Sequence, residues 1–94
     1  MRQEIILVDI DGTLTNEVCF TEEECVMATP RYNSIAYVNQ LHNENFIVIY
    51  TARRQELYFP TITWLKMYGV KYHAIQFGKI PGKIFDLDAI NETE

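Results

Sequence analysis

Two short apolar runs along the chain predict buried strands of a parallel sheet. Residues 4–9 (EIILVD) form a nearly continuous apolar run that ends on an acidic residue, and residues 46–50 (FIVIY) repeat the pattern. Strands covered on both faces show such uninterrupted runs, whereas strands with one wet face alternate apolar and polar positions. Residues 72–76 and 84–87 are weaker strand candidates, so the sequence predicts four strands.

Two segments between these runs have the apolar spacing of helices. The first is expected to start at Pro30, with Thr29 as its N-cap, and to end near residues 43–45. The second is expected to start around residue 59 and to end at Gly69, which would serve as its C-terminal cap. Strands and helices therefore alternate along the chain.

This alternation predicts an α/β fold, a three-layer α/β/α Rossmann-like sandwich with a mostly parallel sheet, as one domain over residues 1–94. In such folds a site lies beyond the carboxyl ends of the strands. Residues 15–28 interrupt the alternation and carry several glutamates with little periodicity. We expect a loop or hairpin there, with the glutamates facing water.

Composition restricts the classes of partner. The 94 residues carry a net charge of -5 and are 48% hydrophobic, which is typical of a globular chain and offers no basic face for a long nucleic acid. No apolar run approaches the length of a membrane span, and no stretch has the pattern of a signal peptide. Cys19 and Cys25 are the only cysteines, which favours free thiols in a reducing, cytoplasmic setting.

The string DIDGTLT, residues 9–15, directly follows the first apolar run and so falls at the expected site-bearing edge of the sheet. Asp9 and Asp11, one residue apart at a strand end, can share a bound cation that keeps both ionised. Gly12 permits a tight turn that brings backbone N–H groups toward a phosphate. The alternative is an acidic N-cap and turn after a strand.

This string resembles the first motif of the haloacid dehalogenase (HAD) superfamily. The resemblance implies that Asp9 attacks phosphorus and that Asp11 acts as general acid and base. It also implies that Gly12 and Thr13 lie against the phosphate. Small capless members of the family, such as the capsule-biosynthesis phosphatases, are the most similar in pattern along the whole chain.

Thr51 ends the second apolar run and matches the second HAD motif, a Thr or Ser that hydrogen-bonds a phosphoryl oxygen. Taken alone, a Thr at a strand end is more often a cap. Arg53 is expected to reach either the substrate or an acidic group near it, with an ordinary ion pair as the alternative. Lys79 matches the third motif, a Lys that neutralises nucleophile and phosphate, and Lys83 is the fallback.

The fourth motif of the family is an adjacent acidic pair, whereas residues 86–88 read DLD. Residues two apart in a strand point to the same side, so Asp86 and Asp88 could both face a metal together with Asp9 and Asp11. The resemblance implies Mg²⁺, which prefers oxygen ligands and tolerates water among them. The alternative for this segment is a helix cap after a strand.

The resemblance thus implies a Mg²⁺-dependent phosphomonoester hydrolase that forms an aspartyl-phosphate on a sugar phosphate or another small substrate. The intervals between motifs leave no room for an inserted cap domain, so an open site in a minimal HAD core is expected. Two alternatives stay open: a polynucleotide 3′-phosphatase or nucleotidase, and an impaired phosphate- or metal-binding module. Five aromatic residues could include a homo-oligomer contact, although most of them are expected to be core or ordinary surface aromatics: Tyr32, Tyr37, Tyr58, Phe59 and Trp64.

Overall fold

A computed structural model describes residues 3–79, which form a three-stranded parallel sheet in the order β1-β2-β3. The strands are β1 (Ile5–Val8), β2 (Phe46–Tyr50) and β3 (Ala74–Gln76). Val8 of β1 pairs with Ile49 of β2, and Ile49 pairs with Ile75 of β3. The three strands lie within the predicted runs, and their parallel pairing confirms the α/β, Rossmann-like fold.

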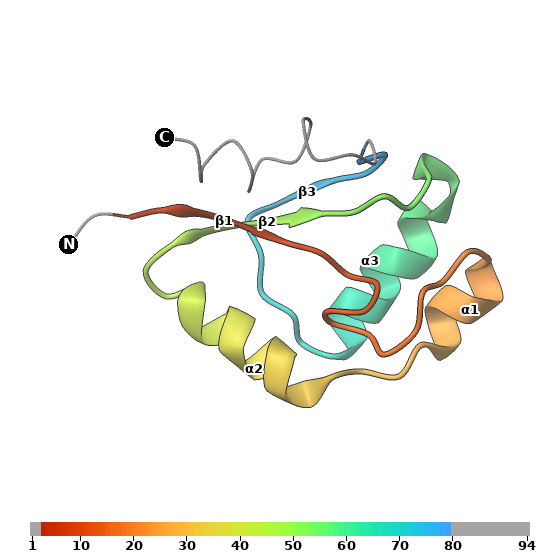
Figure 1. Ribbon diagram of the computed structural model, residues 1–94, viewed down its shortest axis with the longest axis horizontal. Helices are drawn as coiled ribbons and strands as arrows, with labels where there is room; N and C mark the ends of the chain where they lie inside the picture. Colours follow the sequence, from red (N-terminus) through yellow and green to blue (C-terminus); the bar gives the residue numbers. More distant parts are fainter. Residues whose placement is uncertain (1–2, 80–94) are drawn as a thin grey trace.

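The helices of the described residues lie on one face of this sheet (Figure 1). They are α1 (Glu22–Met27), α2 (Tyr32–Leu41) and α3 (Tyr58–Met67), which follows the short 3₁₀ helix η1 (Gln55–Leu57). Successive right-handed crossovers that advance in one direction place their helices on the same side of the sheet. These residues supply two of the three predicted layers, and the expected strand at 84–87 lies outside them.

The core forms between β2 and the helices. Ile47 and Ile49 point toward the helices and are fully buried, and they join Trp64 and Leu65 of α3 in one apolar cluster. Burial therefore alternates along β2, with Phe46 38% exposed, rather than being uniform as the apolar run predicts. Trp64 belongs to this core, so it cannot take part in a contact between copies of the chain. The other four aromatic residues considered for such a contact are exposed: Tyr32, Tyr37, Tyr58 and Phe59.

The segment between β1 and α2 contains a helix where a loop or hairpin was expected. Thr21 accepts a hydrogen bond from the Glu24 amide, while the Glu24 carboxylate accepts one from the Thr21 amide, which forms a capping box at the start of α1. Cys25 is the one buried residue of α1. The loop prediction was wrong here because two reciprocal caps and one buried contact suffice for a short helix.

The two ends of this segment are joined by backbone pairing. Thr15 and Pro30 form an isolated antiparallel bridge, and the Arg31 amide donates to the Leu14 carbonyl at 2.8 Å. Pro30 is thereby held in an extended pairing, so α2 starts at Tyr32 with Arg31 as N-cap, two residues later than predicted. We call residues 16–29, which lie between the bridged ends, the α1 excursion.

Other local features agree with the sequence. α3 starts within one residue of the predicted position, and Gly69 follows its C-cap at φ +68°, as a C-terminal glycine should. Cys19 and Cys25 are both buried and free. Within residues 3–79, no helix has the length and apolar character needed to cross a membrane.

Replacement of Ile47 by alanine tests the core. Its side chain is fully buried, so Ile47→Ala should lower the free energy of unfolding by about 2–5 kcal/mol in urea denaturation. Ile5→Ala is the matched control, because Ile5 is 64% exposed and its loss should change stability by about 0.5 kcal/mol or less. Equal losses in the two variants would contradict this assignment of the core.

Candidate active site

The segments that follow the strands meet at one edge of the sheet. Asp9 follows β1, Thr51 follows β2 and Lys79 comes three residues after β3. The Thr51 amide donates to the Gln76 carbonyl at 3.0 Å, and the Lys79 amide donates to the Thr51 carbonyl at 2.9 Å. Parallel pairing thus continues beyond the strands and brings three of the predicted site residues together.

Asp9 is half-buried at this edge. Its Oδ1 accepts a hydrogen bond from the Ile10 amide at 2.8 Å, and Oδ2 accepts none from residues 3–79. Burial raises the pKa of Asp9, and the Ile10 hydrogen bond and the positive charge of Lys79 offset this only in part. The site therefore presents a partly desolvated carboxylate with one oxygen that accepts no hydrogen bond from the described part of the chain.

A tight turn follows Asp9. The Ile10 carbonyl accepts hydrogen bonds from the amides of residues 13–15, at 3.0, 2.8 and 3.1 Å, and Gly12 takes φ +81° at the tip. Arg31 fixes the turn by donating from Nη1 to the Gly12 carbonyl at 2.7 Å. The Thr13 amide is consequently occupied within the turn, whereas the exposed Gly12 amide makes no hydrogen bond to residues 3–79.

Asp11 is held by a partly buried ion pair with Arg53, in which the Arg53 side chain is buried and the Asp11 side chain is 15% exposed. Arg53 Nη2 and Nε donate to Asp11 Oδ1 at 2.8 and 3.3 Å, and Nε also donates to Oδ2 at 3.1 Å. Oδ1 accepts a further hydrogen bond from the Cys19 amide at 3.1 Å. The Asp11 side chain therefore has one fixed orientation, with Oδ1 more fully hydrogen-bonded than Oδ2.

The Arg53 guanidinium is anchored from α3 as well. Its side chain is 2% exposed, and Nη1 donates to the hydroxyl of Thr61 at 2.8 Å. Burial lowers the pKa of Arg53, but the hydrogen bonds and charge of Asp11 outweigh it and leave the pKa raised. Of the contacts expected for Arg53, the structure contains the one to a neighbouring acidic group.

Thr51 and Lys79 have different surroundings. The Thr51 side chain is fully buried, and its hydroxyl accepts a hydrogen bond from the Arg53 amide at 3.1 Å, so it caps the turn after β2. Because the Thr51 side chain is fully buried, its hydroxyl does not reach the surface of this edge in the structure. Lys79 Nζ lies 5.4 Å from the centroid of the Tyr50 ring, a cation–π contact, and makes no salt bridge with a carboxylate of residues 3–79.

The described oxygen donors are compatible with a hard cation, although they do not by themselves complete a site. The Asp9 carboxylate has a free oxygen, whereas the Asp11 carboxylate is committed to Arg53, so Asp11 would contribute its backbone carbonyl. Residues 3–79 contain no cluster of three or more acidic, His or Cys side chains suited to a metal. The predicted ligands Asp86 and Asp88, and the fallback Lys83, lie outside the described residues.

A pocket of about 300 Å³ lies beside Asp11. Its walls come from the α1 excursion on one side and from the segment after β2 on the other, and they are mainly apolar. Arg54 adds an exposed cation to this lining. In the described chain no carboxylate lies within salt-bridge distance of Arg54.

Sequence reasoning did not find two groups that hold the Asp11–Arg53 pair, Thr61 at Arg53 and the Cys19 amide at Asp11. Thr61 lies inside a helical segment, and nothing in its neighbours marks it as the partner of an arginine eight residues earlier. The Cys19 contact uses a backbone amide, which every residue except proline offers. Neither contact has a signal in a single sequence.

Comparisons with known proteins place the chain in a family. No family model matches it, and no curated protein matches it. A crystal structure of a target protein from Vibrio cholerae is similar, with 30% sequence identity and a TM-score of 0.69. The match covers 84% of this chain and 72% of that one, so the chain belongs to the same family as the Vibrio cholerae protein.

A second similar structure shares the fold only. It is a chain of the Pnkp1/Rnl/Hen1 RNA repair complex, with 13% sequence identity and a TM-score of 0.75. The match covers 96% of this chain but 32% of the other, so this chain spans about a third of that protein's length. The parallel α/β arrangement therefore recurs within a larger protein.

The raised pKa of Asp9 predicts that its charge destabilises the fold. When the pKa of a carboxyl group is higher in the folded protein than in the unfolded chain, the free energy of unfolding falls as the pH rises from the unfolded pKa to the folded pKa. Asp9→Asn should therefore increase the free energy of unfolding at pH 7 in EDTA. The gain should vanish below about pH 4, where the wild-type carboxyl is also protonated in the unfolded chain.

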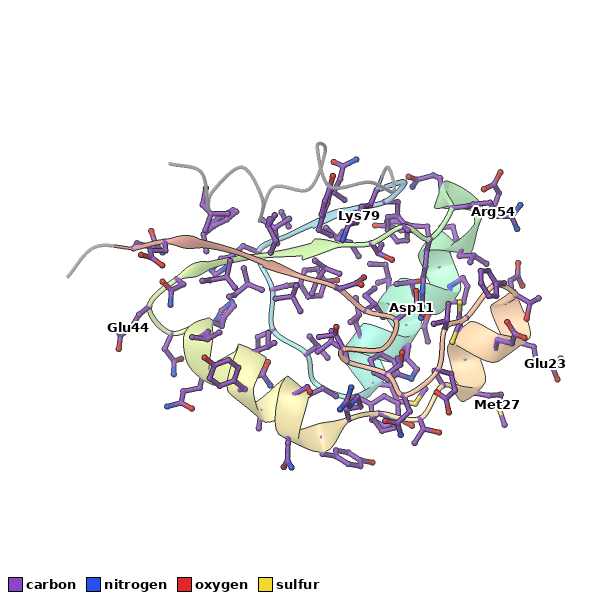
Figure 2. The ribbon with its side chains drawn as sticks, in the orientation of Figure 1. Asp11, Glu23, Met27, Glu44, Arg54 and Lys79 are labelled. Carbon is purple, nitrogen blue, oxygen red and sulfur yellow. The ribbon has the colours of Figure 1, made fainter. Side chains whose placement is uncertain are left out.

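Urea denaturation of both proteins across this pH range measures the effect. Glu44→Gln is the control, since Glu44 is an exposed carboxylate far from Asp11 (Figure 2) and should leave stability nearly unchanged at every pH. A loss of stability in Asp9→Asn at pH 7 would contradict the prediction.

Removal of the Thr61 hydroxyl tests the anchoring of Arg53. Thr61→Val keeps the shape of a fully buried side chain but leaves Arg53 Nη1 without this acceptor, so unfolding free energy should fall by about 1–3 kcal/mol. Thr63→Val, at an exposed position of the same helix, should have little effect. Equal stability of the two variants would show that the hydroxyl does not hold the guanidinium.

Proposed function

We propose that the chain is a HAD-type phosphatase that hydrolyses a small phosphomonoester through an aspartyl-phosphate on Asp9. The observation that carries this proposal is the half-buried Asp9 carboxylate, with one oxygen free, at an edge shared with Asp11, Thr51 and Lys79. A desolvated carboxylate beside a cation suits nucleophilic attack on a phosphate group. The DxDGT pattern of residues 9–13 supports the same reading.

In the first step Asp9 Oδ2 attacks phosphorus and the bond from phosphorus to the leaving oxygen breaks. For this step Asp11 must carry a proton on Oδ2 rather than the charge that it has in the ion pair with Arg53; it gives that proton to the leaving oxygen, so an alcohol leaves. In the second step water attacks the phosphorus, Asp11 takes a proton from the water, and the bond between phosphorus and Asp9 breaks. Phosphate is released and both carboxyl groups return to their starting states.

The contacts of Asp11 suggest which oxygen exchanges the proton. Oδ1 accepts from Arg53 Nη2, Arg53 Nε and the Cys19 amide, whereas Oδ2 accepts from Arg53 Nε alone. Oδ2 is thus the oxygen with capacity for a proton. Arg53 acts as a positioning residue, since it contacts Asp11 rather than an open surface.

Charge on the phosphate would be balanced by Lys79 and by the exposed Gly12 amide. Mg²⁺ would be held by Asp9, by the backbone carbonyl of Asp11 and by an acidic residue of the 86–88 segment. When bound, it supplies Lewis-acid stabilisation of the phosphoryl oxygens. The donors are hard oxygens, as this ion prefers.

A second candidate is a 3′-phosphatase acting on RNA ends, suggested by the similar fold in an RNA repair complex. The net charge of -5 disfavours binding along a polyanion. Competition by a short 3′-phosphorylated oligonucleotide distinguishes the two, because strong competition would favour the RNA-end reading.

Release of p-nitrophenol from its phosphate ester tests the proposed function. The wild type and Glu44→Gln should both turn over with Mg²⁺ and lose activity in EDTA. Asp9→Asn should lower kcat by at least about 1,000-fold, because it removes the nucleophile. Turnover that survives in Asp9→Asn would overturn the role of Asp9, and absence of both turnover and Mg²⁺ binding by calorimetry would favour a binding module.

A further inference from the structure

The pocket beside Asp11 has a composition that restricts the substrate. Apolar residues from both walls line it: Val18, Phe20, Ala52 and Leu57. Its polar side chains are few, since Asp11 and Arg53 are already paired with each other, and this leaves Arg54 as the available charged group. An apolar pocket with one placed cation is a typical small-molecule site.

The position of the pocket identifies the part of the substrate that would enter it. Under the proposed function Asp11 protonates the leaving oxygen, so the atoms beyond that oxygen must lie on the Asp11 side of the phosphate. Asp11 itself is one wall of the pocket. The pocket is therefore the place for the leaving group.

Size and chemistry narrow the leaving group further. A cavity of about 150 Å³ holds benzene, so a pocket of about 300 Å³ has room for one ring with a substituent. A sugar carries a hydroxyl on most carbons, and each would need a hydrogen-bond partner that this lining lacks. An aromatic ring would be covered by Phe20 and Leu57, and a carboxylate on it would meet Arg54.

We propose that this pocket binds the leaving group of a single-ring aromatic phosphomonoester that carries a carboxylate, with Arg54 as the residue that recognises the carboxylate. The proposal rests on the proposed phosphatase function. It adds a substrate class and assigns Arg54 and Phe20 to specificity rather than to the reaction at phosphorus.

Matched esters test it. The protein should hydrolyse 4-carboxyphenyl phosphate with a kcat/KM about fivefold or more above that of 4-carbamoylphenyl phosphate, which has the same shape without the charge. Glycerol 2-phosphate, whose leaving group is hydroxyl-rich, should be a poorer substrate than either. Arg54→Gln should bring the carboxylate-to-carboxamide ratio close to one, whereas Phe20→Ala should lower kcat/KM for both aryl esters by about tenfold and keep the ratio.

Lys66→Gln is the matched control, because it removes one exposed positive charge near the end of α3, outside the pocket lining. The ratio should stay at its wild-type value in this variant. A second readout does not depend on turnover: 4-hydroxybenzoate, the alcohol that hydrolysis releases, should shift the amide NMR signals of Ala52 and Leu57 in the presence of EDTA. Arg54→Gln should weaken that binding.

The outcomes separate the two proposals. Hydrolysis of both aryl esters with equal kcat/KM, or a ratio unchanged in Arg54→Gln, overturns the assignment of the pocket and leaves the phosphatase standing. Failure to hydrolyse any ester overturns both proposals. If the ratio is as expected but 4-hydroxybenzoate does not shift the amide signals of Ala52 and Leu57, the carboxylate binds elsewhere and the assignment of this pocket to the leaving group is overturned.

Discussion

The ion pair between Arg53 and Asp11 is the contact on which the local structure of this edge depends. A charge removed from water is costly unless its partners satisfy it fully, and both members here are satisfied. The partners come from four segments: the turn after β1, the segment after β2, helix α3 and the α1 excursion. Breaking one contact leaves a charge without its full set of hydrogen bonds. The ion pair therefore fixes the positions of the four segments relative to one another.

The parallel sheet explains why these segments meet, and the same packing makes Asp9 unfavourable for stability. Parallel strands end at the same edge, where their last residues are near each other whatever their separation in sequence. The same packing partly desolvates Asp9 and raises its pKa, so a group suited to attack phosphorus is also a destabilising one. Stability and the proposed chemistry therefore make opposite demands on Asp9, as is common for functional residues.

The apolar runs and their alternation with helical segments predicted the fold, whereas contacts between side chains far apart in the sequence could not be predicted from it. The apolar runs located all three described strands, and the position of the DIDGT string at a strand end correctly placed Asp9 and Asp11 at the carboxyl edge of the sheet. Thr21 and Glu24 have the spacing of a capping box, a signal that the loop prediction for residues 15–28 left unused. Arg53 was recognised as a cation near an acidic group, yet its anchoring by Thr61 depends on how α3 packs and has no local signature.

The α1 excursion connects the proposed proton donor Asp11 with the pocket that would bind the leaving group. One short stretch carries the Cys19 amide that orients Asp11 and the Val18 and Phe20 side chains that wall the pocket. The base of the excursion is fixed by the bridge between Thr15 and Pro30, and its helix packs against α3. A ring that enters the pocket would therefore press on the same segment that holds Oδ1 of Asp11. The 14 residues of the α1 excursion, folded back beside the sheet edge, would thus select the leaving group and position its proton donor together, in a pocket of about 300 Å³ that has room for one ring.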